Sequence, residues 1–80
     1  MYTTESFIVF PEGDTQEIEH TLHINELVDI NGNPLALPLA TNRCIAFRVS
    51  RRIQKENRGG EQIFHYLELL SAAELLSYVG

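Results

Sequence analysis

The chain gathers all six of its basic residues into the stretch RCIAFRVSRRIQKENR, from Arg43 to Arg58. The whole chain nevertheless carries a formal net charge of −5. Guanidinium and ammonium groups concentrated in this way can bind phosphates, carboxylates or the faces of aromatic rings. A simpler interpretation is that a basic strand pairs with acidic strands beside it and only balances their charge.

Aromatic side chains are expected beside these cations, because the basic stretch and residues 61–70 form a predicted hairpin. Its outer face places Arg52 opposite Phe64 and Ser50 opposite Tyr66. Rings next to cations can stack bases and bind phosphates, and Tyr, Phe and Arg are also enriched where proteins meet. A third interpretation is a solvated face closed by cation–π pairing. The residues predicted to bind a partner are Arg52, Lys55, Arg58, Phe64 and Tyr66.

The other reactive side chains do not predict catalysis or metal binding. His20 and His23 face opposite sides of a strand, so they cannot hold one ion together. His20 and His65 fall on core faces, where we expect hydrogen-bonded, partly buried histidines. Cys44 follows Arg43 but has no activating motif around it. We therefore predict no enzymatic activity, no cofactor, no metal site and no small-molecule substrate.

The length and cysteine content of the chain limit its class. Its 80 residues fit one small domain over 1–80, and a core of this size is marginal in stability. Cys44 is the single cysteine, so no disulfide can form within the chain. A free thiol suits a reducing compartment, and MYTTESFIVF lacks the basic region of an export signal. No stretch approaches the roughly 20 apolar residues of a membrane span, so we expect a soluble, cytoplasmic protein without membrane contact.

The first half of the chain predicts short strands separated by turns. Residues 7–10 form an apolar run of aromatic and β-branched residues, closed by the turn residues Pro11 to Asp14. Residues 16–25 alternate with period two, which indicates a strand with one buried face. That face carries Ile18, His20, Leu22 and Ile24.

The middle of the chain predicts a tight hairpin. Asn31-Gly32 between apolar flanks is typical of a two-residue type I′ turn, whose central positions both need positive φ. An alternative is one helical turn over residues 26–29, capped by Asn25.

The following segment, residues 35–39, should lie at a sheet edge or leave the sheet, because Pro34 and Pro38 cannot donate to a ladder. Apolar side chains exposed near an edge can be covered in a symmetric dimer. Self-association is therefore predicted through Leu35, Leu37 and Leu39.

The basic stretch is the longest predicted strand, with residues 61–70 as its partner. A three-residue loop over 57–59, with Gly59 in the left-handed region, sets Glu56 opposite Gly60. In this register Arg48 meets Glu68 on the outer face. The other face is apolar except where Arg51 meets His65. Its predicted core residues are Ile45, Phe47, Val49, Ile53, Ile63, Leu67 and Leu69.

The end of the chain predicts a short helix over about residues 72–79. Ser71 and Glu74 have the spacing of a capping box, and Leu70 and Leu75 that of a hydrophobic staple. An apolar stripe along the helix consists of Ala72, Leu75, Leu76 and Val79. So short a helix must dock on something to be stable. The predicted fold is α+β and mainly β: four to six short antiparallel strands within about residues 6–70, as hairpins in a small barrel or curved sheet, followed by this helix.

The predicted function is that of a small non-enzymatic binding domain that acts through protein contacts, with itself or with another protein. The alternative is single-stranded nucleic-acid binding through the basic, aromatic hairpin 43–66. Protein is favoured because a chain of net charge −5 attracts phosphates poorly at long range. The basic hairpin is also small beside the footprints of typical nucleic-acid binders.

Overall fold

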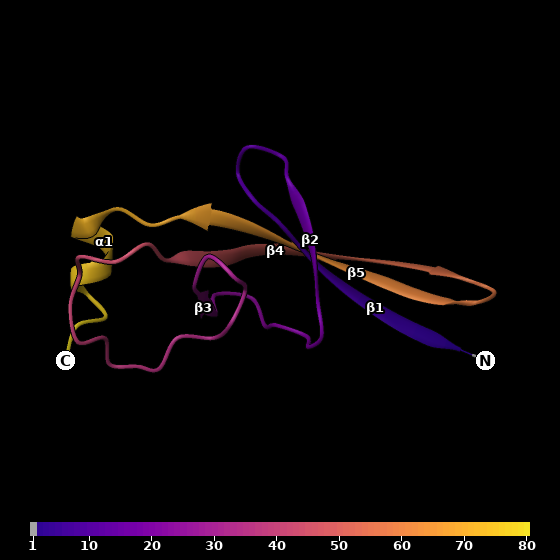
Figure 1. The fold of residues 1–80 in the computed structure, drawn as a ribbon, viewed down its shortest axis with the longest axis horizontal. Coiled ribbons are helices and arrows are strands. Elements are labelled where there is room, and N and C mark those ends of the chain that lie inside the picture. The colour runs from indigo at the N-terminus through magenta and orange to yellow at the C-terminus, as the bar shows by residue number, and fades with distance from the viewer. Residues whose placement is uncertain (1) are drawn as a thin grey trace.

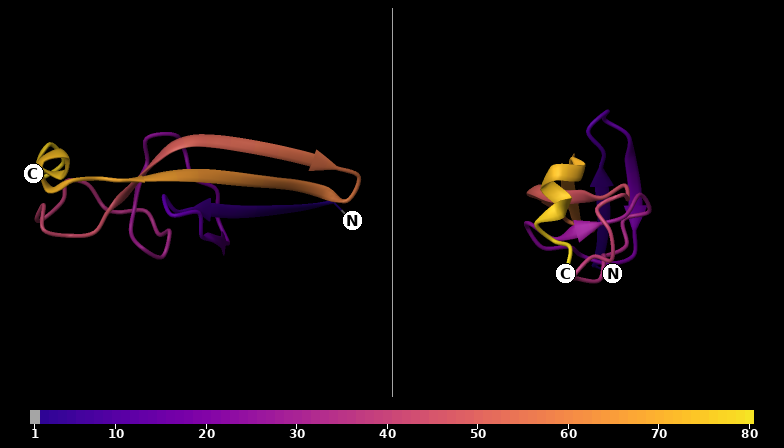
Figure 2. Two further views of the ribbon diagram at one scale, coloured as in Figure 1. Left: turned by 90° about the horizontal axis from the view of Figure 1, so that it is seen from above. Right: turned by 90° about the vertical axis from the view of Figure 1, so that its left-hand side faces the viewer.

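A computed structural model of the chain describes residues 2–80 as one five-stranded sheet followed by a short helix. The molecule is elongated, at 44 × 23 × 17 Å, with the tip of the β4–β5 hairpin at one end and the helix at the other (Figures 1 and 2). The sheet order is β2-β1-β5-β4-β3. The elements are β1 (Thr3–Val9), β2 (Thr15–Ile18), β3 (Leu27–Val28), β4 (Phe47–Asn57), β5 (Gly60–Leu69) and α1 (Ala72–Leu76).

The mainly-β fold with a C-terminal helix is confirmed, but the sheet is mixed rather than purely antiparallel. Strand β1 runs parallel to β5 over seven residue pairs, from Thr3 beside Gly60 to Val9 beside Tyr66. The other three pairings are antiparallel. This parallel pairing places Ile8 beside His65 on the buried side of the sheet, and both side chains are fully buried.

Strand β1 begins earlier than predicted, and β2 ends much earlier. The predicted turn between them is confirmed, because the Phe10 N–H donates to Asp14 O at 2.8 Å and Gly13 adopts a positive φ of 102°. Strand β2 stops at Ile18 instead of continuing to residue 25. The chain then turns inward to bury Leu22 completely and passes through Asn25, whose φ is 72°, and this backbone cannot continue a strand.

The segment after Asn25 is the edge strand β3 and not a helical turn, so that alternative is wrong. The two-residue type I′ turn is also wrong, because Gly32 has a positive φ of 82° while Asn31 does not. The Asp29 carboxylate explains the longer loop: its Oδ1 accepts from the N–H groups of Asn31 at 2.8 Å and Asn33 at 3.0 Å. A single bridge joins Val28 to Pro34.

Residues 35–39 leave the sheet, which is one of the two predicted outcomes for the proline-flanked segment. Leu39 is buried and Leu35 is half-buried against the helix, whereas Leu37 remains 55% exposed. The predicted apolar surface of this segment therefore shrinks to one side chain.

The β4–β5 hairpin follows the predicted register only as far as Val49, which pairs with Leu67. A β-bulge at Ser50 then places both Ser50 and Arg51 opposite Tyr66, and the Ser50 hydroxyl donates to Tyr66 O at 3.1 Å. Beyond the bulge every pair is shifted by one residue. Asn57 rather than Glu56 therefore faces Gly60, and the three-residue loop with a left-handed Gly59 is wrong.

The bulge exchanges the two faces of β4. Arg51 now lies on the outer face, and Arg52 lies opposite His65 on the buried face. Ile53, predicted for the core, pairs with Phe64 on the outer face instead. Ile45 and Leu69, also predicted for the core, are 60% and 58% exposed, and Ala46 is buried beside Ile45.

Two clusters of buried side chains stabilise the fold. The first fills the covered face of the sheet, where Phe10 packs edge-on against Phe47 with ring centroids 5.3 Å apart. It comprises Ile8, Ile18, Leu22, Val28, Phe47, Val49 and Leu67. The second lies at the helical end of the molecule and comprises Leu27, Leu39, Ala46, Leu70 and Leu75.

The helix begins as predicted and ends early. The capping box is present: the Ser71 N–H donates to Glu74 Oε1 at 2.9 Å, and the Glu74 N–H donates to Ser71 Oγ at 3.2 Å. Leu70 and Leu75, the staple pair, are both buried. The helix stops at Leu76, which is 61% exposed, and so only part of the predicted apolar stripe is covered. No helix formed by residues 2–80 is long and apolar enough to cross a membrane.

Candidate binding face

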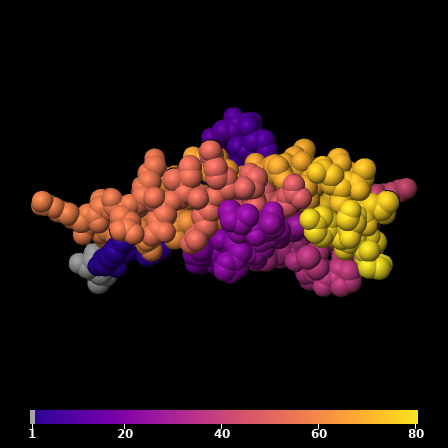
Figure 3. Space-filling view, turned by 180° about the vertical axis from the view of Figure 1, so that it is seen from behind, coloured from indigo at the N-terminus to yellow at the C-terminus, as the bar shows by residue number. Residues whose placement is uncertain are grey.

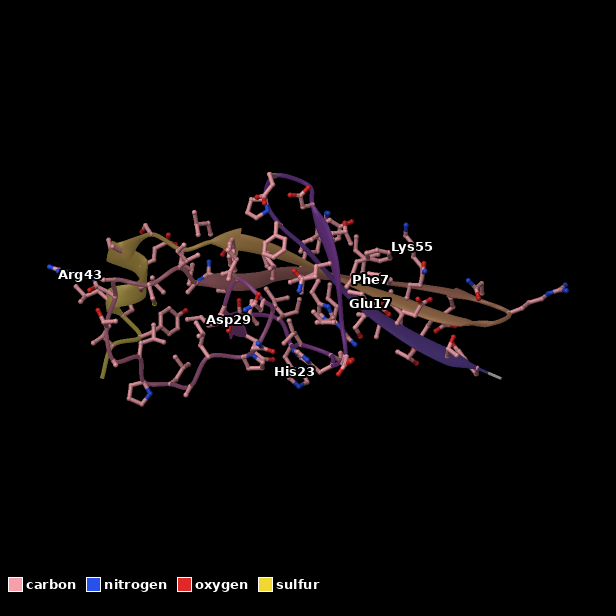
Figure 4. All side chains as sticks on the ribbon, in the orientation of Figure 1. Phe7, Glu17, His23, Asp29, Arg43 and Lys55 are labelled. Atoms are coloured by element: carbon pink, nitrogen blue, oxygen red, sulfur yellow. The ribbon has the colours of Figure 1, made fainter. Side chains whose placement is uncertain are left out.

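One face of the sheet carries the core and the opposite face is open. Among the described residues, no helix or other strand packs on the open side, and its apolar side chains are only half-buried. We call this side the aromatic face. It consists of Glu5, Phe7 and Val9 on β1, Thr15 and Glu17 on β2, Arg51, Ile53 and Lys55 on β4, and Gln62, Phe64 and Tyr66 on β5. Figure 4 labels Phe7, Glu17 and Lys55 from three of these strands.

The centre of the aromatic face is a pair of stacked rings. Phe7 and Phe64 lie side by side because β1 and β5 pair in parallel at this position. Their centroids are 5.1 Å apart, with an interplanar angle of 16°. Tyr66 follows two residues along β5, beside Val9. The face therefore presents a continuous strip of aromatic and aliphatic carbon along the neighbouring strands β1 and β5.

Two cations lie over these rings. The Arg51 Cζ atom is 4.5 Å from the Tyr66 ring centroid, and the Lys55 Nζ atom is 5.2 Å from that of Phe64. Both distances are within the range of a cation–π interaction. The bulge at Ser50 is the cause, because it places Arg51 rather than Arg52 on this side.

The structure brings together three of the five residues predicted to bind a partner. Lys55, Phe64 and Tyr66 share the aromatic face. Arg52 lies on the opposite face, so its predicted pairing with Phe64 is wrong. Arg58 is exposed in the turn at the hairpin tip, beyond the strip of rings.

Sequence reasoning missed Arg51, Phe7, Val9 and Ile53. The run of residues 7–10 predicts a short strand without assigning its faces, and of β1's apolar side chains only Ile8 is fully buried. The alternation of Glu5, Phe7 and Val9 with Ser6 and Ile8 was the available signal, since it follows period two.

Across residues 2–80 the only ion pair joins Arg48 to Glu68, as predicted, and this carboxylate raises the pKa of Arg48.

The charges of the aromatic face are divided between its two sides. Arg51 and Lys55 lie on the β4 side of the rings, and Glu5 and Glu17 lie on the β1–β2 side. Their four charges cancel.

His65 lies beneath the aromatic face, on the buried side of the sheet, with no exposed surface. Its Nδ1–H donates to Phe7 O at 2.9 Å, and its Nε2 accepts from the Leu22 N–H at 3.1 Å. This pair of bonds fixes the neutral tautomer. Burial lowers the pKa of His65, and the charge of Arg52 adds to the effect.

The expectation of a hydrogen-bonded histidine is confirmed for His65, which is buried more completely than predicted. It is also confirmed for His20, which is partly buried and whose Nε2 lies 2.9 Å from Gly32 O. Within the part of the chain that the structure describes, no group of three or more His, Cys, Asp or Glu side chains is arranged to hold a metal ion. Cys44 is exposed, with its Sγ 3.8 Å from Thr41 O.

A shallow hollow borders the aromatic face near the β1–β2 turn. Its lining includes Pro11 and Gly13 from the turn, and Val9, Arg51 and Tyr66 from the sheet. Figure 3 shows the surface of the molecule from behind, with the hairpin tip and the helix at opposite ends of an elongated body. The hollow extends the apolar strip toward the middle of the molecule.

The sequence model of a family described as "Uncharacterised Treponema protein" matches residues 2–78. No curated protein and no solved structure matches the chain.

Proposed function

The chain belongs to this Treponema family, and we propose that it is a small non-enzymatic binding domain that contacts a protein chain through its aromatic face. One observation carries the proposal: an open sheet face presents stacked Phe7 and Phe64 rings and Tyr66, with cations lying over them. Aromatic residues and arginine are the types most enriched at the centres of protein interfaces. The non-enzymatic role rests on the same side chains, which pair no nucleophile with a general base.

The charge pattern favours a protein partner over a nucleic acid. A binder of single strands needs a basic groove along the phosphate backbone. Here Glu5 and Glu17 offset Arg51 and Lys55 on the same face, and the whole chain is acidic at −5. A surface with both signs of charge around an apolar centre suits a complementary protein surface.

Single-stranded nucleic acid remains the second candidate, and the residue types of the face support it. Binders of single strands combine aromatic side chains for the bases with cations for the phosphates, and the face carries Phe64 and Tyr66 beside Lys55 and Arg51. The acidic residues beside the rings weigh against this reading, since they repel phosphate.

The proposed location is the cytoplasm. Support comes from Cys44, an exposed thiol with no cysteine in the chain to pair with. Such a thiol is more compatible with a reducing compartment than with an oxidising one.

The proposal is tested by removing the rings. The double variant F64A/Y66A should lose proteins that co-purify with the wild-type chain, because truncated anchors typically cost 1 kcal/mol or more of binding free energy each, roughly a fivefold loss of affinity. The matched control is L76A, since Leu76 is exposed on the helix outside the aromatic face. Quantitative mass spectrometry of tagged chains purified from native lysate measures the loss.

Nuclease treatment separates the two candidates in the same experiment. Retention of partners after nuclease, with loss in F64A/Y66A, supports protein contact. Binding of a labelled oligothymidine that weakens steeply with salt supports the nucleic-acid alternative. Equal recovery of partners by the wild type and F64A/Y66A would refute a role for the face.

A further inference from the structure

We propose that the aromatic face binds a second copy of the chain, face to face, about a two-fold axis that runs along β5. This inference rests on the proposed function and names its partner. Sheets are stable when each apolar face is buried against another layer, and residues 2–80 supply such a layer on one face only.

The aromatic face is arranged in rows that cross the strands. One row runs from Glu5 through Gln62 to Lys55, and the next runs from Phe7 through Phe64 to Ile53. A third runs from Val9 through Tyr66 to Arg51. In each row the β5 residue is central, with neighbouring strands about 4.8 Å away on either side.

A two-fold axis along β5 exchanges the positions of β1 and β4 between the copies. It therefore places Lys55 of one copy over Glu5 of the other, and the reverse pair forms at the same time. In the next row Ile53 meets Phe7 of the second copy, while Phe64 meets its own counterpart. Opposite charges thus face each other in the first row and carbon faces carbon in the second, while in the third row Arg51 meets Val9 of the second copy.

A two-fold axis that crosses the strands, instead of running along β5, is disfavoured by charge. An axis across the strands would lay β4 over β4, so that Arg51 and Lys55 of the two copies approach one another. Like charges brought together in this way oppose association. With the axis along β5, the strands of the two sheets run in nearly the same direction, as in aligned β-sandwiches, whose sheets are about 10 Å apart.

The charges concerned are available for such a contact. Neither Glu5 nor Lys55 forms an ion pair within residues 2–80. Lys55 is exposed and lies against the Phe64 ring, so its charge is held close to the strip that the second copy would cover. The same is true of Arg51 above Tyr66.

The test is a charge exchange measured by sedimentation equilibrium. The wild-type chain should sediment as a dimer of 9.1 kDa subunits. The variants E5K and K55E should each weaken self-association by about tenfold or more, because each creates two like-charge contacts. An equimolar mixture of E5K and K55E should regain the wild-type affinity, since every contact in the mixed dimer then joins opposite charges.

Two control variants test whether the effect is specific to the aromatic face. E56K changes the residue beside Lys55 on the opposite side of the sheet, and R58E changes the hairpin tip. Both should leave the dimer unchanged. A second measurement uses a short bis-maleimide reagent on chains with Cys44→Ser. Gln62→Cys lies on the proposed axis and should give cross-linked dimers, whereas Glu56→Cys should not.

Several results would overturn the inference. These are a monomer at hundreds of micromolar, a dimer that tolerates both charge reversals, a mixture that fails to regain affinity, or equal cross-linking at positions 56 and 62. A monomeric wild type that still loses co-purified proteins in F64A/Y66A would retain the proposed function with a different partner. Failure of both experiments would remove the function as well.

Discussion

His65 shows how one buried polar side chain can organise several segments. Its two ring nitrogens bond the carbonyl of Phe7 on β1 and the N–H of Leu22 in the loop after β2. Protonation would place a hydrogen on Nε2, where it would face the Leu22 N–H. The neutral ring is therefore the form that the fold requires, and both burial and the charge of Arg52 lower its pKa.

Stability should consequently fall on mild acidification. The pKa of His65 is lowered from its ordinary value of 6.5, so below about pH 6.5 the unfolded chain binds more protons than the folded chain. The free energy of unfolding then decreases as the pH falls. Urea denaturation at pH 8, 7, 6 and 5.5 measures this. H23Q, a change at an exposed histidine, should keep the trend. A flat profile for the wild type would contradict the assignment.

Predictions about the contacts of single residues were correct where those contacts depended only on the nearby sequence. The ion pair of Arg48 with Glu68 follows from matching charges before the bulge, and it is present. Arg52 was assigned to the wrong face because one extra residue, Ser50, reverses the alternation after it. A serine within a strand carries no sign of a bulge in the sequence, since the bulge depends on how the whole hairpin packs.

At the scale of elements, the helix α1 was predictable at its start but not at its end. The capping box between Ser71 and Glu74 is a local signal, and its hydrogen bonds lower the pKa of Glu74. The end depends on tertiary contacts: the chain leaves the helix after Leu76, and Val79 then forms a bridge with Leu39. No sequence pattern near residue 76 predicts the bridge between Val79 and Leu39.

The helix should stabilise the second buried cluster mainly through the side chain of Leu75. Leu75 is 1% exposed, whereas its neighbour Leu76 is 61% exposed. We expect L75A to reduce the free energy of unfolding by about 2–5 kcal/mol, because it removes buried contacts and leaves a cavity. L76A should change it by less than about 0.5 kcal/mol. Urea titration of both variants measures the difference, and similar losses would show that the helix docks on another face.

At the scale of the whole molecule, the parallel pairing of β1 with β5 could not be predicted from the sequence. Hairpins are visible because their strands are neighbours along the chain. Strand β1 instead pairs with a strand 57 residues later, where the Thr4 hydroxyl donates to Glu61 Oε1 at 3.2 Å. The open face follows from this topology, since Phe7 and Phe64 meet only when the two strands lie side by side.

The junction between β1 and the hairpin tip can be tested with two adjacent glycines. The Thr3 N–H donates to Gly59 O at 3.1 Å, and a Cβ added to Gly60 would lie 2.0 Å from Thr3 O. G60A should therefore push β1 away and destabilise the fold by at least about 1 kcal/mol. The same addition at Gly59 would meet only Asn57 Oδ1, at 3.7 Å, so G59A should be nearly neutral. Hydrogen exchange of the Thr3–Val9 amides should accelerate in G60A alone. If the two variants were equally stable and equally protected, β1 would not lie beside β5 at this point, and the Phe7–Phe64 stack would lose its support.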